Sequence, residues 1–140
     1  MSNLRLTYEV IAGDMGRAGE ASSAVKQTLR KMGFDSDTIR RVSVCMYEGE
    51  INMVIHANGG VAEVDVGLDD ITITLRDTGP GIPDIEKAMQ EGFSTAGDHA
   101  RNLGFGAGMG LPNMKKYSDE MTVESTVGVG TTVTMVIHAS

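Results

Sequence analysis

Two segments of the chain combine residue types that suit the binding of a nucleotide. Asp77-Thr78-Gly79-Pro80-Gly81-Ile82 follows a β-branched run, and glycines 104, 106, 108 and 110 alternate just before a helical pattern. A carboxylate at a strand end can accept a hydrogen bond from an exocyclic amine, which selects adenine over guanine, and nearby glycines let a flat ring approach the backbone. Bare N–H groups beside a helix N-terminus bind phosphates. Together the two segments predict a site for adenine and polyphosphate.

A third element lies upstream, where Glu48, Asn52 and His56 follow one another at four-residue spacing. This spacing places them along one stripe of a helix. The stripe is flanked on both sides by apolar residues and a glycine: Val42, Gly49, Met53, Val44, Ile51 and Ile55. Burying a carboxylate and an amide among apolar side chains costs free energy unless these groups are paired or bind a ligand. Two interpretations stay open, a polar network inside the core or a Mg²⁺ site with few protein ligands.

Other polar residues carry weaker signals. His56 is better explained as a histidine at a helix end whose hydrogen bonds are satisfied than as a metal ligand. Glu50 lies roughly 200° around the helix from Glu48, and we expect it on the solvent face beside Ser43 and Tyr47. In the long segment, His99, Arg101 and Asn102 could reach phosphates on loop closure, although solvated positions suit each of them better. Gly130-Thr131 could place a hydroxyl under the ring or simply begin a strand.

Hydrophobic periodicity and turn residues predict the elements that position these groups. In chain order they are a strand at 4–11, helices at 18–32 and 38–57 (the second capped by Ser36 or Asp37), strands at 61–68 and 71–76, a helix at 83–90, a long loop at 91–110, a helix at 111–118, and strands at 121–127 and 131–138. Strands that come in adjacent pairs favour an α+β two-layer sandwich over a doubly wound sheet. We expect one domain, 1–140, with a mixed, mostly antiparallel sheet and helices on one face.

Composition narrows the class of partner. The chain has 12 Lys and Arg against 19 Asp and Glu, a net charge of −7, which argues against nucleic acid or an anionic membrane surface as partner. Basic residues gather at Lys26, Arg30, Lys31, Arg40 and Arg41, where a solvated helix face is favoured over a docking patch for an acidic partner. One cysteine, no signal-peptide core and no long apolar run predict a cytoplasmic protein.

These motifs resemble those of the GHKL (Bergerat-fold) ATP-binding superfamily. Glu48-x-x-x-Asn52 looks like its N box, Asp77-x-Gly79-x-Gly81 its G1 box, and Gly106-x-Gly108-x-Gly110-Leu111 its G2 box. Gly128-x-Gly130-Thr131 is similar to the last conserved turn. The resemblance implies the Bergerat fold with ATP and Mg²⁺ as cofactors. It also implies a nucleotide site that comprises Asn52, Asp77, Gly79, Gly81, Ile82, Gly106, Gly108, Gly110, Leu111 and Thr131.

Within the superfamily, the chain is similar to the bacterial anti-sigma-factor serine/threonine kinases, above all to the stressosome switch-kinase (RsbT-like) branch. The features that carry this are Gly79-Pro80-Gly81-Ile82-Pro83-Asp84-Ile85 and Glu91-Gly92-Phe93-Ser94-Thr95. The stretch from Thr95 to Gly106 is longer than in that branch, which leaves the role of the lid at 91–110 open. By position, the resemblance implies that Glu48 is the general base, that Asn52 is the Mg²⁺ ligand and that Asp77 accepts a hydrogen bond from adenine N6.

The partners that the resemblance implies are a STAS-domain antagonist protein as substrate, and a sigma factor or a phosphatase regulator as a further candidate. A homodimer also stays open. The competing hypothesis is a nucleotide-gated anti-sigma factor that sequesters its partner with little turnover. A simple ATPase of the same superfamily is a third, weaker interpretation.

Overall fold

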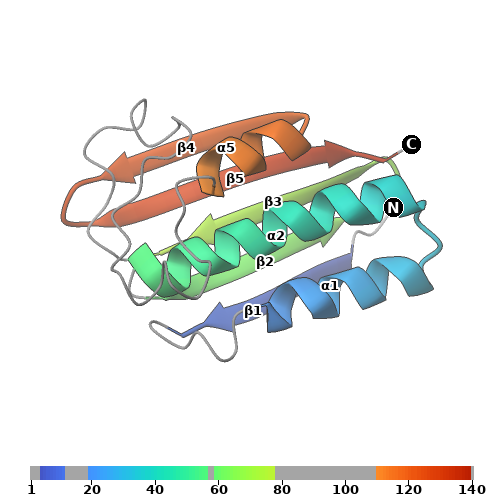
Figure 1. Cartoon of the computed structure of the whole chain (residues 1–140), viewed down its shortest axis with the longest axis horizontal. Coiled ribbons are helices and arrows are strands. Elements are labelled where there is room, and N and C mark those ends of the chain that lie inside the picture. The colour runs from blue at the N-terminus through green and yellow to red at the C-terminus, as the bar shows by residue number, and fades with distance from the viewer. Residues whose placement is uncertain (1–3, 12–18, 57–58, 78–109, 140) are drawn as a thin grey trace.

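The computed structural model describes residues 4–11, 19–56, 59–77 and 110–139. Three helices and five strands are present in this part of the chain (Figure 1). In chain order they are β1 (Leu4–Val10), α1 (Glu20–Lys31), α2 (Ser36–His56), β2 (Gly60–Val66), β3 (Asp70–Arg76), α5 (Gly110–Tyr117), β4 (Glu120–Thr126) and β5 (Gly130–His138). The helix expected at 83–90 lies outside the described residues. None of the helices in the described ranges is long and apolar enough to cross a membrane.

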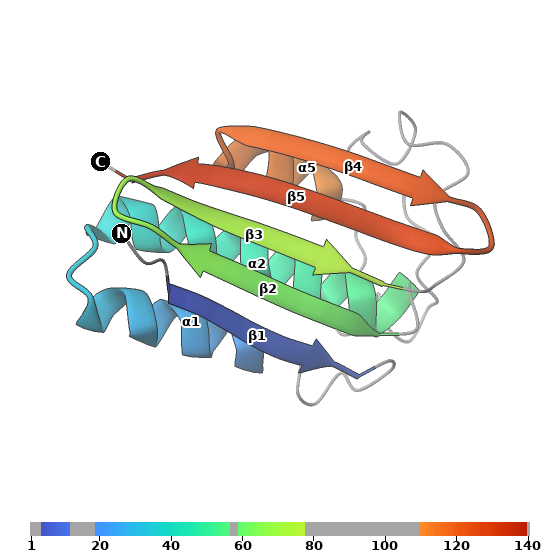
Figure 2. The same ribbon diagram turned by 180° about the vertical axis from the view of Figure 1, so that it is seen from behind.

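The five strands form one open sheet in the order β1-β2-β3-β5-β4, and each neighbouring pair is antiparallel. The helices of the described ranges cover one face of this sheet, and the view from behind shows that none of them lies on the other face (Figures 1 and 2). The predicted α+β two-layer architecture is therefore confirmed. Because β3 pairs with β5, the chain around Arg76 lies beside Thr132 although the two are far apart in sequence.

The core lies between the sheet and the helices. Strand residues that alternate toward the helices are buried, as the period of two requires, and they include Val64, Ile71, Ile73, Met135 and Ile137. α1 and α2 supply the opposing apolar stripes with Val25, Leu29, Val42 and Met46. The opposite face of the sheet is polar, with a cross-strand ion pair from Arg5 to Asp65 at 2.7 Å.

The helix ends confirm one predicted cap and correct another. After α1, Gly33 has φ +86° and the N–H of Phe34 donates to the carbonyl of Leu29 at 3.2 Å, so the predicted glycine stop is confirmed. For α2 the prediction of Ser36 or Asp37 was wrong. Asp35 is the cap, because its carboxylate accepts hydrogen bonds from both the N–H and the hydroxyl of Thr38.

The basic residues of α1 and α2 divide into two groups. Lys26, Arg30 and Lys31 are exposed on α1, as predicted for a solvated face. Arg41 instead reaches across the layers, since it donates to Asp119 at 2.9 Å and to the carbonyl of His138 at 2.7 Å. The residue therefore ties the first half of α2 to the start of β4 and the end of β5.

Candidate functional site

Most of the predicted site residues in the described ranges lie at one end of the molecule. The end of α2, the end of β3, the start of β5 and the start of α5 all meet at the left of Figure 1. This arrangement follows from the antiparallel order, because β3 ends where the neighbouring β5 begins. The predicted site residues that the structure describes therefore come from four elements.

Glu48 lies half-buried in the middle of α2, on the side that faces α5. Its Oε1 accepts a hydrogen bond from Nδ2 of Asn113 at 3.4 Å. Burial raises the pKa of the Glu48 carboxyl because the charged form loses water, while the hydrogen bond from Asn113 opposes the rise. A carboxylate of raised pKa is a better proton acceptor near neutral pH.

Asn52 lies one turn further along the same face of α2 and is also half-buried. Its amide has no hydrogen bond to another residue in the described part of the chain. A carboxylate and an amide oxygen on successive turns suit a hard cation that keeps most of its shell for water and phosphate. Across the described ranges, no group of three or more His, Cys, Asp or Glu could hold a metal ion. The chemistry of this carboxylate and amide fits Mg²⁺ held by few protein ligands.

Gly49 fixes the position of this part of α2 on the sheet. A Cβ at residue 49 would lie 2.1 Å from Cδ1 of Leu75, which is far closer than any real contact. The side chain of Leu75 on β3 therefore packs directly against the helix backbone at the residue that follows Glu48. Leu75 is only two residues before Asp77, so this contact sets the spacing between the Glu48 face of α2 and the end of β3.

Asp77 follows β3 and is joined to Thr131 at the start of β5. Its N–H donates to the carbonyl of Thr131 at 3.0 Å, and its Oδ1 accepts the N–H of Thr131 at 3.2 Å. The hydroxyl of Thr131 is 2.8 Å from Oγ of Ser125 on β4. These bonds hold the Asp77 carboxylate in a fixed place at the end of the sheet, which is what the reading of a base edge requires.

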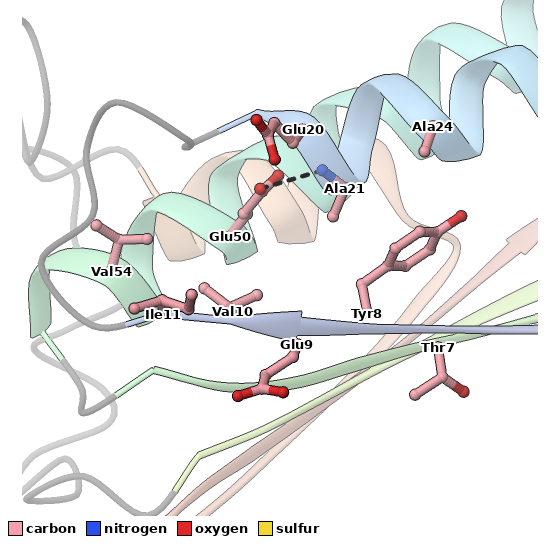
Figure 3. Close-up of a pocket in the computed structure, with 10 residues that line it drawn as sticks. All are labelled: Thr7, Tyr8, Glu9, Val10, Ile11, Glu20, Ala21, Ala24, Glu50 and Val54. Atoms are coloured by element: carbon pink, nitrogen blue, oxygen red, sulfur yellow. Dashed lines mark hydrogen bonds between the residues drawn. The ribbon is translucent and has the colours of Figure 1, made fainter.

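The prediction for Glu50 was wrong. Glu50 is only 4% exposed, and its two oxygens accept the N–H groups of Ala21 and Ser22 at 3.2 Å each. The helical-wheel argument failed because α1 packs against this side of α2 (Figure 3). The residue before α1 is Gly19, which has no side chain to cap the helix. The Glu50 carboxylate supplies that cap from a neighbouring helix.

Several site residues are not placed. Five residues of the predicted nucleotide site lie outside the described residues: Gly79, Gly81, Ile82, Gly106 and Gly108. Most of the lid at 91–110 also lies outside them, including His99, Arg101 and Asn102. The side chain of His56 is not described. Gly110 begins α5, and Leu111 beside it is buried at 6% exposure in the core.

Sequence reasoning missed Asn113 and Ser125, and it did not foresee the contact between Gly49 and Leu75. An amide one turn into the helix after the glycine segment was a usable signal for Asn113. A lone glycine within a helical pattern was the signal for Gly49.

Comparison with known proteins shows the family of the chain. Residues 23–140 match the family described as histidine kinase-, DNA gyrase B- and HSP90-like ATPases. The chain belongs to this family. Membership implies that the chain binds ATP.

Relatives of known name are similar over most of their length. The serine/threonine-protein kinase RsbT of Bacillus subtilis is 33% identical over 112 residues, which covers 77% of this chain and 78% of the relative. An anti-sigma F factor of Caldanaerobacter subterraneus is 38% identical over 104 residues, covering 71% and 69%. An anti-sigma F factor of Geobacillus kaustophilus is 35% identical over 108 residues, covering 73% and 70%.

Solved structures share the fold. The RsbU and RsbW domains of a Mycobacterium tuberculosis protein superpose with a TM-score of 0.65 at 16% identity, over 97% of this chain and 32% of that one. A mycobacterial sensor histidine kinase, MprB, gives a TM-score of 0.53 at 15% identity, over 97% and 98% of the two chains. At such identity the likeness concerns the fold alone.

Proposed function

We propose that this protein is an ATP-dependent serine/threonine protein kinase of a partner-switching pathway, and that its substrate is a STAS-domain antagonist protein. The observation that carries the proposal is the half-buried Glu48, whose pKa is raised by burial and which shares one face of α2 with Asn52. A bare ATP-binding module has no need of such a base. The similarity to a protein named as a serine/threonine kinase supports the same conclusion.

In this mechanism Glu48 accepts the proton of the attacking serine or threonine hydroxyl. Asn113 holds one of its oxygens and so orients the carboxylate toward the docked substrate. Phosphoryl transfer depends on positioning and charge neutralisation more than on covalent chemistry. A base that only orients the hydroxyl and takes its proton is therefore sufficient.

The remaining residues hold the nucleotide. Asp77 accepts a hydrogen bond from the N6 amine of adenine, and its hydrogen bonds with Thr131 keep it in place. Asn52 would be the protein ligand of Mg²⁺, which when bound neutralises charge on the phosphate oxygens. Gly79, Gly81 and Ile82 would line the ring, while Gly106, Gly108 and Gly110 would donate N–H groups to phosphates. Leu111 packs into the core and anchors the start of α5.

The test is transfer of radiolabelled phosphate from ATP to purified STAS proteins in the presence of Mg²⁺, with mapping of the modified residue. We expect Glu48→Gln to abolish transfer, a loss of at least about 100-fold, while ATP affinity is retained. Glu120→Gln is the matched control, since Glu120 is exposed at the start of β4 and pairs with Val136, at the opposite end of the sheet from Thr131. Equal loss of transfer and of ATP binding in Glu48→Gln would remove Glu48 as the base.

A second candidate function is a nucleotide-gated anti-sigma factor with little turnover. It is favoured by the named relatives that are anti-sigma F factors. A pull-down that recovers a sigma factor only in the presence of ATP, with no labelling of any STAS protein, would support it. Labelling of an antagonist without sigma-factor binding would support the kinase.

A further inference from the structure

The line of contact between α2 and α5 forms a seam on the helix side of the sheet (Figure 1). Asn113 of α5 donates to Glu48 of α2 at 3.4 Å, and the thiol of Cys45, one turn before Glu48, donates to the carbonyl of Met114. The two helices therefore run in opposite directions, and the last turn of α5 lies beside the first half of α2. A protein that brings a hydroxyl to Glu48 comes to lie over this seam.

Two cations of the seam share the ring of Tyr117. The guanidinium carbon of Arg40 is 5.6 Å from the centre of this ring, and Nζ of Lys116 is 5.5 Å from it. Tyr117 is half-buried and packs against the core, so its ring is a fixed platform that attracts both cations. The negative end of the helix dipole accounts for lysines in the last turn of α5, but not for an arginine of α2 on the same ring.

This cluster has positive charge left for a partner. Arg40 pairs with Asp37 at 3.0 Å, but the two side chains are 59% and 57% exposed, and a pair so exposed contributes little free energy. Lys115 and Lys116 are exposed and have no ion pair with another residue in the described ranges. No residue of α5 is acidic. In a chain of net charge −7, the seam is therefore a place where an acidic surface is attracted.

The basic residues of α1 do not have this position. α1 packs on the side of α2 that carries Glu50, whereas α5 packs on the side that carries Glu48 (Figure 1). Lys26, Arg30 and Lys31 of α1 are exposed, but they lie across α2 from the seam. Among the described residues, the positive charge on the Glu48 side of α2 therefore belongs to α5 and to the first turns of α2.

We propose that the seam between α2 and α5 is the docking surface for an acidic segment of the protein substrate, with Arg40 and Lys116 as its anchors. The inference rests on the kinase function proposed above, and it adds to that function the charge of the segment that the site accepts. Electrostatic complementarity of this kind sets the rate of encounter and the choice of partner more than the raw affinity.

The length of the seam sets the spacing in the substrate. Arg40 lies a little more than two turns before Glu48, which is about 12 Å along the helix. An extended segment covers this distance with about four residues. Glutamate or aspartate side chains are therefore expected about four residues from the hydroxyl that accepts the phosphate.

Fluorescence anisotropy with a labelled peptide tests the docking surface on the full chain without phosphoryl transfer. The probe carries a serine and a pair of glutamates about four residues from it, and a matched peptide carries lysines in place of the glutamates. We expect the acidic peptide to bind, with an affinity that falls as salt is raised, and the lysine peptide not to bind. Lys116→Glu should weaken binding of the acidic peptide about tenfold, because it replaces an attraction by a repulsion.

Lys31→Glu is the matched control, since it makes the same change in net charge at an exposed position of α1. It should leave the affinity for the acidic peptide within about twofold of the wild type. Melting temperatures show that both variants fold. Equal weakening by the two variants would mean attraction by net charge alone and overturns the proposal. Failure of the acidic peptide to bind the wild type, or equal binding of the lysine peptide, overturns it as well.

Transfer kinetics give a second measurement, with a STAS protein that the wild type labels as substrate. Arg40→Glu and Lys116→Glu should each raise KM for that protein about tenfold while kcat and KM for ATP stay unchanged, because these residues act on docking alone. Glu48→Gln should instead lower kcat. An unchanged KM for the protein in both seam variants contradicts the proposal. If no STAS protein is labelled, the kinase function fails, while the peptide experiment still decides whether the seam binds acidic segments.

Discussion

Replacement of Glu50 by alanine tests the unexpected link between α1 and α2. The substitution removes two hydrogen bonds of 3.2 Å and leaves the N–H groups of Ala21 and Ser22 unpaired in a buried place. Each hydrogen bond to a charged group contributes about 1.5 kcal/mol. The higher helix propensity of alanine returns only a few tenths of a kcal/mol. We therefore expect the free energy of unfolding to fall by about 3 kcal/mol.

Urea denaturation followed by circular dichroism measures this change. With about 3–4 °C lost for each kcal/mol in a domain of this size, the melting temperature should fall by about 10 °C. Glu50→Gln keeps one acceptor oxygen and should lose about half as much stability. Glu20→Ala is the control, because Glu20 lies in the first turn of α1, as Ala21 and Ser22 do, but its side chain is exposed. A Glu50→Ala variant within about 0.5 kcal/mol of the wild type would refute the reasoning, since only surface residues are so tolerant.

Three further predictions concern individual side chains. Asp77→Asn should lose ATP binding in calorimetry while its melting temperature stays close to that of the wild type, because the amide oxygen can still accept the N–H of Thr131. Burial raises the pKa of Cys45 to about 12. A thiol reagent at about pH 8, near the pKa of a free thiol, should therefore leave Cys45 of the native protein unlabelled and react with it after unfolding. Rapid labelling of the folded chain would contradict this. The hydrogen bond from His138 to Asp70 raises the pKa of His138. The stabilising effect of this bond is therefore complete below about pH 6.5, the pKa of histidine in an unfolded chain, and it is lost as the pH rises through the pKa of His138 in the folded chain. The difference in stability between the wild type and His138→Asn should therefore shrink with rising pH, and a difference that grew would reverse the assignment.

Much of the fold was predictable because its signals are local. Alternation in the strands, the glycine after α1 and the paired strands are written in short segments, and each appears in the structure within one or two residues. The buried state of Glu50 was not predictable, because a helical wheel for α2 does not reveal that α1 packs on that side. Nor could spacing alone disclose that Asp77 bonds to Thr131, a contact across 54 residues of sequence.

The side chain of Leu75 on β3 packs against the backbone of α2 at Gly49, so the two elements lie close together at this point. Adjacent residues of a helix point about 100° apart, so a roll of α2 by one residue would bring a side chain against Leu75 in the space that Gly49 leaves open. Such a roll would also change the direction of the Glu48 side chain. The missing side chain at residue 49 therefore favours one rotation of α2 relative to β3, and with it one alignment of Glu48 on the helix and Asp77 after the strand.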